Sequence, residues 1–554
     1  MYYLILRLVI TLPFLAWSAF AQTGSGGLAG TVRDESGAAI PAVTIGVLNQ
    51  ESGSQLETVS NDDGHFRVTS LLPGTYRVQA VKPGFEKVLQ QGLIITTGQT
   101  IAIDITLKVG ATSEAVTIQE SAPLAETQSQ SVGQLINRRM VATLPMPNRA
   151  ASSLVALAPG VVMIDPGSGA ENYPVFSVAG GRGRNQHFSL DGGNATNASG
   201  LTRPMQMTSL PMDAMQEFRV VSNNYSAEFG HSAGGVISLT TRSGSNEVHG
   251  SLFEFHRNNV LDARNFFADK KPPLRLNQYG FALGGPIQKD KTHYFASWER
   301  TQQTSSVTPL LTVPTTAQRQ GDFSQLRDSP GNRIVIYDPA TTVGRDRQPF
   351  RNNQIPLNRI DPVSLAALKY WPEPNRPGTV TGANNYSANS NSVLARNIVV
   401  GKLDHQFRPN DLFSARYYIN DAGIENQGSF GIPESDPNAN ITDVRVQSIL
   451  GSYNHIFRPT LVNDLKVTFF QRKFIDKRYG KDEDLAGAIG LQGVSATAFP
   501  NFVIPGYSAL SAPPGRIQTP IRDLQILEAI NWFRGSHSVK AGFEYRRAGN
   551  SESR

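Results

Sequence analysis

The chain of 554 residues carries 51 Lys and Arg against 45 Asp and Glu, a net charge of +6, and only 17% of its residues are charged. Soluble domains average roughly 25% charged residues, so most of the polar surface here must come from uncharged side chains. The sequence has no Cys, which excludes a disulfide scaffold, thiol catalysis and a zinc–thiolate site. Its length exceeds that of one ordinary domain, and the 50 Gly and 27 Phe favour a multidomain, mainly β protein.

Residues 1–21 have the pattern of a cleavable secretory signal. Arg7 is the only charged residue, the apolar run Leu8–Phe20 follows, and the segment closes with Ala19-Phe20-Ala21. The alternative is a membrane anchor, but the run is shorter than the ~20 residues of a spanning helix. No later apolar run is long enough for such a helix, so we expect an exported chain that could enter a membrane only as a barrel.

Residues 22–108 are expected to form a small β-sandwich. Short alternating segments are separated by Gly, Pro and Asp turns, which is typical of sandwich strands. The expected strands are Leu28–Val32, Val43–Val47, Phe66–Val68, Tyr76–Val81 and Ile101–Leu107. Asn61–Gly64 could be part of a calcium loop, but the other acidic ligands of such a loop are missing, and a hairpin turn is favoured.

Four segments of this region resemble the carboxypeptidase regulatory-like domain. They are Gly30–Val43, Gly64–Phe66, Leu72–Tyr76 and Gly84–Phe85. The resemblance implies a transthyretin-like, carbohydrate-binding-like sandwich that has no peptidase activity despite its name.

Residues 109–130 form a linker with one short extended stretch. Its five residues are Glu114, Ala115, Val116, Thr117 and Ile118. They are similar to the box through which outer-membrane receptors engage the periplasmic protein TonB, because an extended strand can add to the edge of a partner's sheet. An ordinary strand that ends the sandwich fits these residues equally well.

Residues 131–245 contain an ordered set of motifs. The set comprises Leu144–Arg149, Leu154–Val161, Gly180–Asn185, Phe188–Gly192, Pro211–Val220 and Gly234–Leu239. Together they are similar to the plug of TonB-dependent receptors, in particular the Oar-like group. The resemblance implies an α/β plug domain, with the plug-motif positions Gly180, Gly181, Arg182, Asn185, Asp191 and Gly192.

Two motifs in the same region suggest catalysis, but their context is wrong. Gly230–Gly234 matches G-x-S-x-G with Ser232 as nucleophile, yet a strand pattern follows where a hydrolase needs a helix. Gly180–Asn185 lacks the Gly-Lys-Ser/Thr ending of a phosphate loop. The 9 His are scattered without a zinc-binding pair. We therefore expect no catalytic residues, no metal and no cofactor.

Residues 246–554 have the alternation of an outer-membrane barrel. Segments such as His249–Arg257, Gln278–Leu283 and His293–Arg300 place aromatic and polar residues on opposite faces, with Phe295 as an exception. A soluble sandwich would also alternate. A repeated strand–turn–strand pattern decides between them, because long polar stretches, such as Asn420–Asn440 and Lys477–Arg516, separate the repeats. Short turns at one end and long loops at the other are typical of bacterial barrels.

This region also carries the strongest family resemblance. Val248–Phe267, Asn277–Phe281 and Gly284–Thr292 are similar to the barrel of Oar-like TonB-dependent transporters. The resemblance implies an outer-membrane receptor for an oligosaccharide, siderophore or peptide, energised by the TonB–ExbB–ExbD complex and surrounded by outer-membrane lipid. No nucleic-acid partner is expected, because no Lys/Arg cluster or recognition motif accompanies the net positive charge. The alternatives are a secreted or surface carbohydrate-binding adhesin and a hydrolase that uses Ser232.

The length of this last region is short for the family. The 309 residues after position 245 hold about nine to eleven strand candidates by alternation, fewer than such receptors contain. The sequence therefore predicts the N-terminal part of a transmembrane antiparallel β-barrel, as in a fragment or a truncated reading frame.

Overall fold

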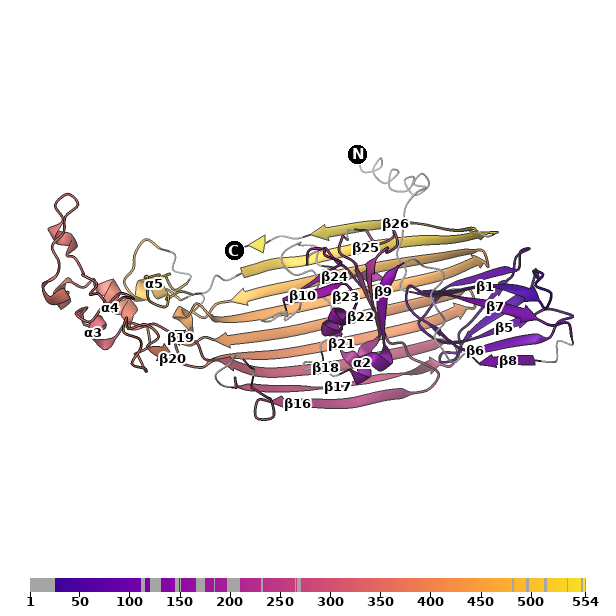
Figure 1. Cartoon of the computed structure of the whole chain (residues 1–554), viewed down its shortest axis with the longest axis horizontal. Coiled ribbons are helices and arrows are strands. Elements are labelled where there is room, and N and C mark those ends of the chain that lie inside the picture. The colour runs from indigo at the N-terminus through magenta and orange to yellow at the C-terminus, as the bar shows by residue number, and fades with distance from the viewer. Residues whose placement is uncertain are drawn as a thin grey trace.

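The computed structural model has a sandwich at one end of a long antiparallel sheet and a central unit packed on the middle of that sheet (Figure 1). It describes residues 25–110, 115–119, 131–144, 149, 151–165, 175–183, 185–196, 210–230, 233–264, 266, 271–480, 483–494, 498–512, 516–535, 537–549 and 552–553. The expected signal segment, Glu114 and Ser232 lie outside the described residues. No helix in the described part is long and apolar enough to cross a membrane.

The sandwich consists of two sheets packed around one apolar core. Its strands are β1 (Gly26–Asp34), β2 (Thr44–Asn49), β3 (Gln55–Val59), β4 (His65–Leu71), β5 (Gly74–Val81), β6 (Lys87–Ile95), β7 (Thr100–Leu107) and β8 (Ala115–Gln119). One sheet has the order β4-β1-β7 and the other β3-β2-β5-β6-β8. All five expected strands are present, whereas β3 and β6 were not predicted because their alternation is weak.

Local chemistry explains the sandwich elements. Along β5, Tyr76, Val78 and Ala80 are buried and alternate with half-buried polar residues, the pattern of a sheet with one face in the core. The Asn61 side chain accepts hydrogen bonds from the backbone N–H groups of Asp63 and His65 at 3.1 and 2.8 Å. Gly64 follows with a φ of 74°, so these residues form the expected tight turn. It is not a hairpin turn, because β3 and β4 belong to different sheets.

The central unit packs against one face of the long sheet (Figure 1). Its five-stranded sheet has the order β13-β12-β15-β14-β9. The strands are β9 (Val132–Asn137), β12 (His187–Leu190), β13 (Gly193–Asn194), β14 (Met215–Asn223) and β15 (Val236–Thr241), with the hairpin β10 (Val161–Asp165) and β11 (Val175–Val178), helix α2 (Arg138–Thr143) and the 3-10 turns η2 (Ala151–Leu157) and η3 (Met212–Ala214). Asn137 caps α2 by accepting the N–H of Met140 at 3.0 Å.

The long sheet is antiparallel, and its strands follow one another in chain order. They are β16 (His249–Asn258), β17 (Leu274–Gln288), β18 (Thr292–Val307), β21 (Ser390–Arg408), β22 (Asp411–Gln427), β23 (Ala439–Arg458), β24 (Leu461–Lys477), β25 (Arg516–Arg534), β26 (His537–Gly549) and the short β27 (Glu552–Ser553), which pairs with β25. We call this the barrel sheet. Four tight turns join its strands at the end nearest the sandwich, which we call the turn end, and long connections lie at the other, the loop end.

Side chains alternate between the two faces of the barrel sheet. On β18, His293, Ser297 and Glu299 are buried on one face, and Trp298 lies on the other. Phe295 shares the inner face with the polar residues and is 1% exposed. It belongs to a core shared with the central unit, which explains why an aromatic stands on the polar face.

The long connections are only partly as expected. The Lys477–Arg516 stretch does connect β24 to β25, but the Asn420–Asn440 stretch was wrongly predicted as a loop. There, β22 continues to Gln427 and β23 begins at Ala439, because Asn420 and Ala422 still alternate into the buried inner face. Polar composition was misleading, since inner-face positions of a barrel are themselves polar.

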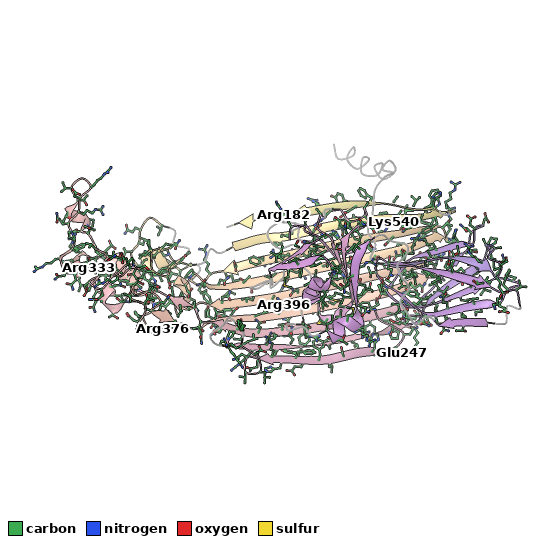
Figure 2. All side chains as sticks on the ribbon, viewed as in Figure 1. Arg182, Glu247, Arg333, Arg376, Arg396 and Lys540 are labelled. Atoms are coloured by element: carbon green, nitrogen blue, oxygen red, sulfur yellow. The ribbon has the colours of Figure 1, made fainter. Side chains whose placement is uncertain are left out.

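Segments of the connections at the loop end fold into a lobe with its own core. The lobe comprises the described residues of 308–389, 428–438 and 478–515, and Figure 2 labels two of them, Arg333 and Arg376. It contains β19 (Leu310–Leu311), β20 (Tyr386–Ser387), α3 (Thr316–Arg319), α4 (Pro362–Leu368) and α5 (Leu485–Ala488). Its core includes Trp371, whose Nε1 donates to the carbonyl of Ser508 at 2.8 Å.

Candidate functional site: contacts of the central unit

Asp191 is the main charged contact between the central unit and the barrel sheet. It follows β12 in a left-handed turn, with φ of 53° at Asp191 and 81° at Gly192, conformations that Asp and Gly tolerate. Its carboxylate accepts the N–H of Thr241 at 2.8 Å and the Thr241 hydroxyl at 2.9 and 3.0 Å. These bonds fix the carboxylate at the end of β15.

Two cations of the barrel sheet face this carboxylate. Arg416 Nε lies 3.1 Å from Asp191 Oδ2, and Lys402 Nζ lies 4.0 Å from Oδ1. The side chains of Arg416, Lys402 and Asp191 are 1%, 6% and 8% exposed. Because desolvated charges are costly unless they are paired, this cluster fixes the position of the central unit strongly.

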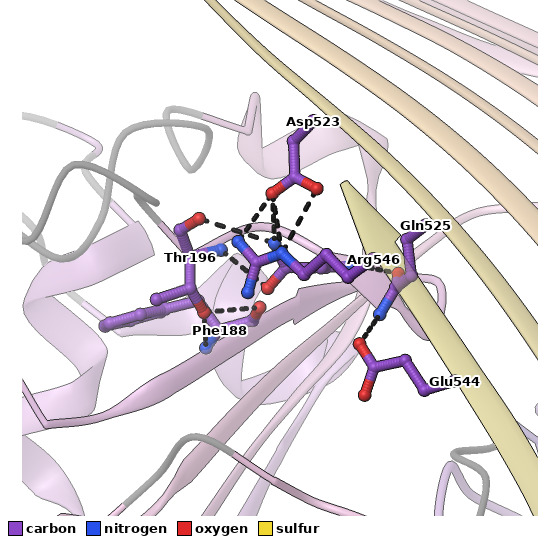
Figure 3. Close-up of polar contacts among 7 residues, drawn as sticks. Phe188, Thr196, Asp523, Gln525, Glu544 and Arg546 are labelled. Carbon is purple, nitrogen blue, oxygen red and sulfur yellow. Dashed lines mark hydrogen bonds and ion pairs between the residues drawn. The ribbon is translucent and has the colours of Figure 1, made fainter. Parts of the chain in front are cut away.

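A second cluster joins the hairpin β12–β13 to the last strands of the barrel sheet (Figure 3). Asn194 donates its backbone N–H to Gln525 Oε1 at 2.8 Å and its side-chain amide to Asp523 at 3.2 Å. Asp523 is in turn held by Arg546 Nε at 2.8 Å, and Gln525 donates to Glu544 at 2.8 Å. This cluster therefore holds one edge of the central unit on β25 and β26.

A third contact reaches the first strand of the barrel sheet. Arg149 pairs with Asp213 at 2.7 Å, and Asp213 also accepts the hydroxyl of Ser251 on β16 at 3.3 Å. The Arg149 guanidinium lies over the rings of Phe253 and Phe255, 5.0 and 3.9 Å from their centroids, a cation–π arrangement. The central unit thus contacts both the first strand, β16, and the last long strands, β25 and β26, of the barrel sheet.

The expected plug-motif residues lie in two places. Asp191 and Gly192 are at the barrel sheet, whereas the other four lie at the opposite end of β12. There, a Cβ on Gly181 would stand 2.8 Å from Gly234 Cα, and the carbonyl of Asn185 accepts the N–H of Ala233 at 3.0 Å. The two glycine motifs therefore pack against each other, and Arg182 is exposed beside them.

The hydrolase hypothesis has no structural support. Ser232 itself lies outside the described residues, but β15 begins at Val236, only four residues later. A nucleophile elbow needs a helix at this position. Within the described part, no group of three or more His, Asp or Glu side chains could hold a metal ion.

The sandwich is fastened to the central unit as well as to the turn end. Thr97 donates its N–H to the buried carboxylate of Glu217, and its hydroxyl lies 2.8 Å from that of Thr240. Burial raises the pKa of Glu217, and the bonds from Thr97 oppose that shift. At the turn end, Asn61 donates to the carbonyl of Gly535 at 3.2 Å.

The stretch expected as a TonB box is already part of a sheet. Ala115–Gln119 forms β8, which pairs in parallel with Lys87–Gln91 of β6. It is thus the last strand of the sandwich sheet, as the alternative interpretation required. Binding of TonB to it stays a prediction.

Sequence reasoning missed the partners of the site on the barrel sheet. Lys402, Arg416, Asp523 and Arg546 were not singled out, although alternation could have placed them. Each of these four residues lies on the inner face of its strand, next to other inner-face residues, and the opposite face of that strand is mainly apolar. A charge at such a position indicates a partner inside the barrel.

Comparison with known proteins decides the family. The outer membrane beta barrel domain family matches residues 240–554, more than half of the chain. The chain belongs to this family. The family places it in the outer membrane, and the carboxypeptidase regulatory-like domain family matches residues 27–108, the sandwich.

Individual relatives agree with that family. The chain is 28% identical over 350 residues to the TonB-dependent transporter Oar of Myxococcus xanthus, an alignment that covers 59% of this chain and 32% of Oar. The chain thus aligns with about a third of the length of this curated relative.

Solved structures that are similar to this chain have lower sequence identity. The transporter YddB from Escherichia coli is 11% identical, with 75% of this chain and 48% of YddB covered and a TM-score of 0.47. The siderophore receptor PirA from Acinetobacter baumannii is 14% identical, with 76% and 48% covered and a TM-score of 0.42.

Proposed function

We propose that this chain acts in a TonB-dependent outer-membrane transporter in which the central unit is the plug. The observation that carries the proposal is the Asp191 cluster, which holds a separate folded unit against the inner face of a barrel sheet through buried ion pairs. Similarity to the Oar transporter supports the same assignment. Apolar contacts with Phe295, Val400 and Val446 also hold this unit, but its strands form a sheet of their own, so its displacement would not require the barrel strands to separate.

The ligand would enter from the lobe at the loop end. An oligosaccharide, siderophore or peptide is compatible with the proposal. TonB, energised by ExbB and ExbD, would act on residues 114–118 and shift the plug. No catalytic step is proposed, because transport of this kind needs only binding and displacement. The adhesin alternative would use the same sandwich but leaves the buried ion pairs beneath the barrel sheet without a purpose.

Two measurements test this function. Cells that express the chain are fractionated, and its gel migration is compared before and after heating, because folded barrels migrate differently from unfolded ones. Purified C-terminal domain of TonB is then added to the isolated outer membranes. We expect a heat-modifiable outer-membrane protein that binds TonB, and loss of binding in Thr117→Pro, because Pro removes a backbone donor from β8. Recovery as a soluble periplasmic protein would overturn the proposal.

A further inference from the structure

Strand β6 contacts two functionally important parts of the molecule. Its first five residues, Lys87–Gln91, pair with β8. Two residues beyond its end at Ile95, Thr97 docks on Glu217 and Thr240 of the central unit. The Thr97 carbonyl also accepts a hydrogen bond from Arg219 at 3.1 Å. A continuous backbone therefore leads from the strand beside β8 to the central unit.

The chain that enters β8 is fastened to the start of β6. Glu86 donates its N–H to Lys108 at 2.8 Å, and Gly110 donates to Gly84 at 3.2 Å. Phe85 and Val109 form an isolated bridge between these two bonds. These contacts hold residues 108–110 beside the residues that precede β6.

Among the described strands, none covers the outer edge of β8. In the sheet order β3-β2-β5-β6-β8 it is the terminal strand, and no described strand pairs with its second edge. Such an edge presents unpaired N–H and C=O groups in the geometry that another strand requires. Strand addition at a sheet edge is an established mode of peptide recognition.

We infer that TonB adds a strand to the outer edge of β8 while β8 stays paired with β6, so that the sandwich sheet and the partner's sheet become one. This inference rests on the proposed function, which supplies TonB as the partner. Force applied at β8 then reaches the central unit through β6 and Thr97, in addition to the covalent path from β8 to β9. The sandwich is in this way an adaptor between the energy source and the plug.

The alternative is that β8 leaves the sandwich before TonB binds. That route breaks five paired positions and exposes the edge of β6, whereas addition at the outer edge breaks none. The bonds that TonB forms would first have to replace those lost, since the net gain of a backbone hydrogen bond is small. The outer edge, which no described strand covers, therefore favours addition over exchange.

A disulfide clamp separates the two routes, and the native chain offers a clean background because it has no Cys. Leu89 and Thr117 are register partners in β6 and β8, so Leu89→Cys with Thr117→Cys would lock the strands together at a spacing that a disulfide can bridge. The matched control is Gly46→Cys with Glu57→Cys, a register pair of β2 and β3 at the opposite edge of the same sheet.

The probe is the purified C-terminal domain of TonB, titrated onto outer membranes that contain the chain, with the clamps oxidised or reduced. We expect the affinity of the oxidised clamp and of the oxidised control for TonB to lie within about twofold of that of the native chain. If the affinity of the oxidised clamp instead falls about tenfold or more, and reduction restores it, the inference is overturned. In that case the unclamped chain still binds, and the proposed function survives. Absence of binding to every form, the native chain included, would overturn the proposed function with it.

Hydrogen exchange gives a second, independent readout without any substitution. If β8 stays in place, the amides of Lys87–Gln91 keep their protection when TonB binds, and those of β8 gain protection. If β8 leaves, the edge of β6 is exposed, and these amides exchange as fast as a frayed edge. Loss of β6 protection on TonB binding would therefore contradict the inference even if the clamp perturbed the fold.

Discussion

The two faces of the barrel sheet each carry an Arg–Asp pair, and the pairs have similar geometry. On the inner face, Arg416 Nε lies 3.1 Å from Asp191 of the central unit, and on the outer face Arg445 Nη2 lies 2.8 Å from Asp421. The exposed fractions differ greatly, 1% and 8% for the inner side chains against 56% and 44% for the outer ones. Distance alone would make the pairs equivalent, so burial must separate their roles.

The difference follows from solvation. The outer pair lies nearer the loop end than Ile449, which is in the middle of β23. A pair that water solvates there gains little. A buried pair is also costly to form, but removing one partner leaves the other charge desolvated and alone. The inner pair therefore specifies where the central unit sits, and the outer pair adds little. Each of the following changes tests this contrast.

The largest effect is expected for Asp191→Ala. Arg416 and Lys402 would remain buried without their carboxylate, and we expect a loss of about 3–5 kcal/mol in the free energy of unfolding, as for other broken buried pairs. Denaturant unfolding of the chain in detergent, followed by intrinsic fluorescence, measures it. The double variant Asp191→Ala with Arg416→Met should recover part of the loss, because one of the unpaired charges is gone. A loss below about 1 kcal/mol in the single variant would contradict the contrast.

A charge added to the apolar part of the outer face should cost slightly less. Ile449 lies in the middle of β23 on the outer face and is 53% exposed. We expect Ile449→Arg to destabilise the folded chain by about 2–4 kcal/mol in lipid, and Ile441→Arg, near the loop end of the same face, by about 0–1 kcal/mol, because the cost depends on depth in the bilayer. Folding titrations into lipid vesicles measure both. Equal losses at the two positions would show that the outer face does not sense the bilayer.

Glu217 has a buried carboxyl group at the contact with the sandwich, and its contribution to the stability of the folded chain should depend on pH. Because burial raises its pKa above the ordinary 4.5, the folded chain holds this proton more tightly than the unfolded chain. Its contribution to stability is therefore fully present below the ordinary pKa and is lost as pH rises through the raised value. In Glu217→Gln this dependence should vanish. Thermal unfolding of both forms from pH 4 to about 8 checks it, and parallel curves would contradict the burial argument.

The smallest effect is expected for Asp421→Ala. Its partner Arg445 is already solvated, so the free energy of unfolding should fall by less than about 1 kcal/mol. The same unfolding assay in detergent applies, and the added salt that weakens this pair should leave the Asp191 cluster nearly unchanged. A loss as large as that of Asp191→Ala would mean that burial does not distinguish the two faces.

Much of the fold could be predicted because strand alternation is a local property. The expected segment His249–Arg257 became β16 and the strand–turn–strand repeats became the tight turns at one end, since each depends on neighbours within about twenty residues. The Asn420–Asn440 stretch was misread for a related reason. Asn420 faces inward and is buried although it is polar, and polarity by itself does not distinguish an inner barrel face from a loop.

The candidate site was much less predictable. Asp191 was singled out by resemblance, but Arg416 and Asp523 are 225 and 332 positions further along the chain, and no local pattern joins them. For Ala115–Gln119, the sequence left a free TonB-binding strand and a sandwich strand open. The pairing of β8 with β6 is determined by tertiary structure, because the sequence of a five-residue strand is too short to specify which strand it pairs with.

The sequence by itself determined the low charge, the alternation, the tight turns and the family, because these depend on composition and on neighbouring residues. Tertiary structure decided which charges are buried, which strand receives β8 and how Thr97 joins the sandwich to the central unit. The physical reason is that desolvation and edge pairing arise only when distant segments meet, and both are set by the folded surroundings rather than by the residue itself.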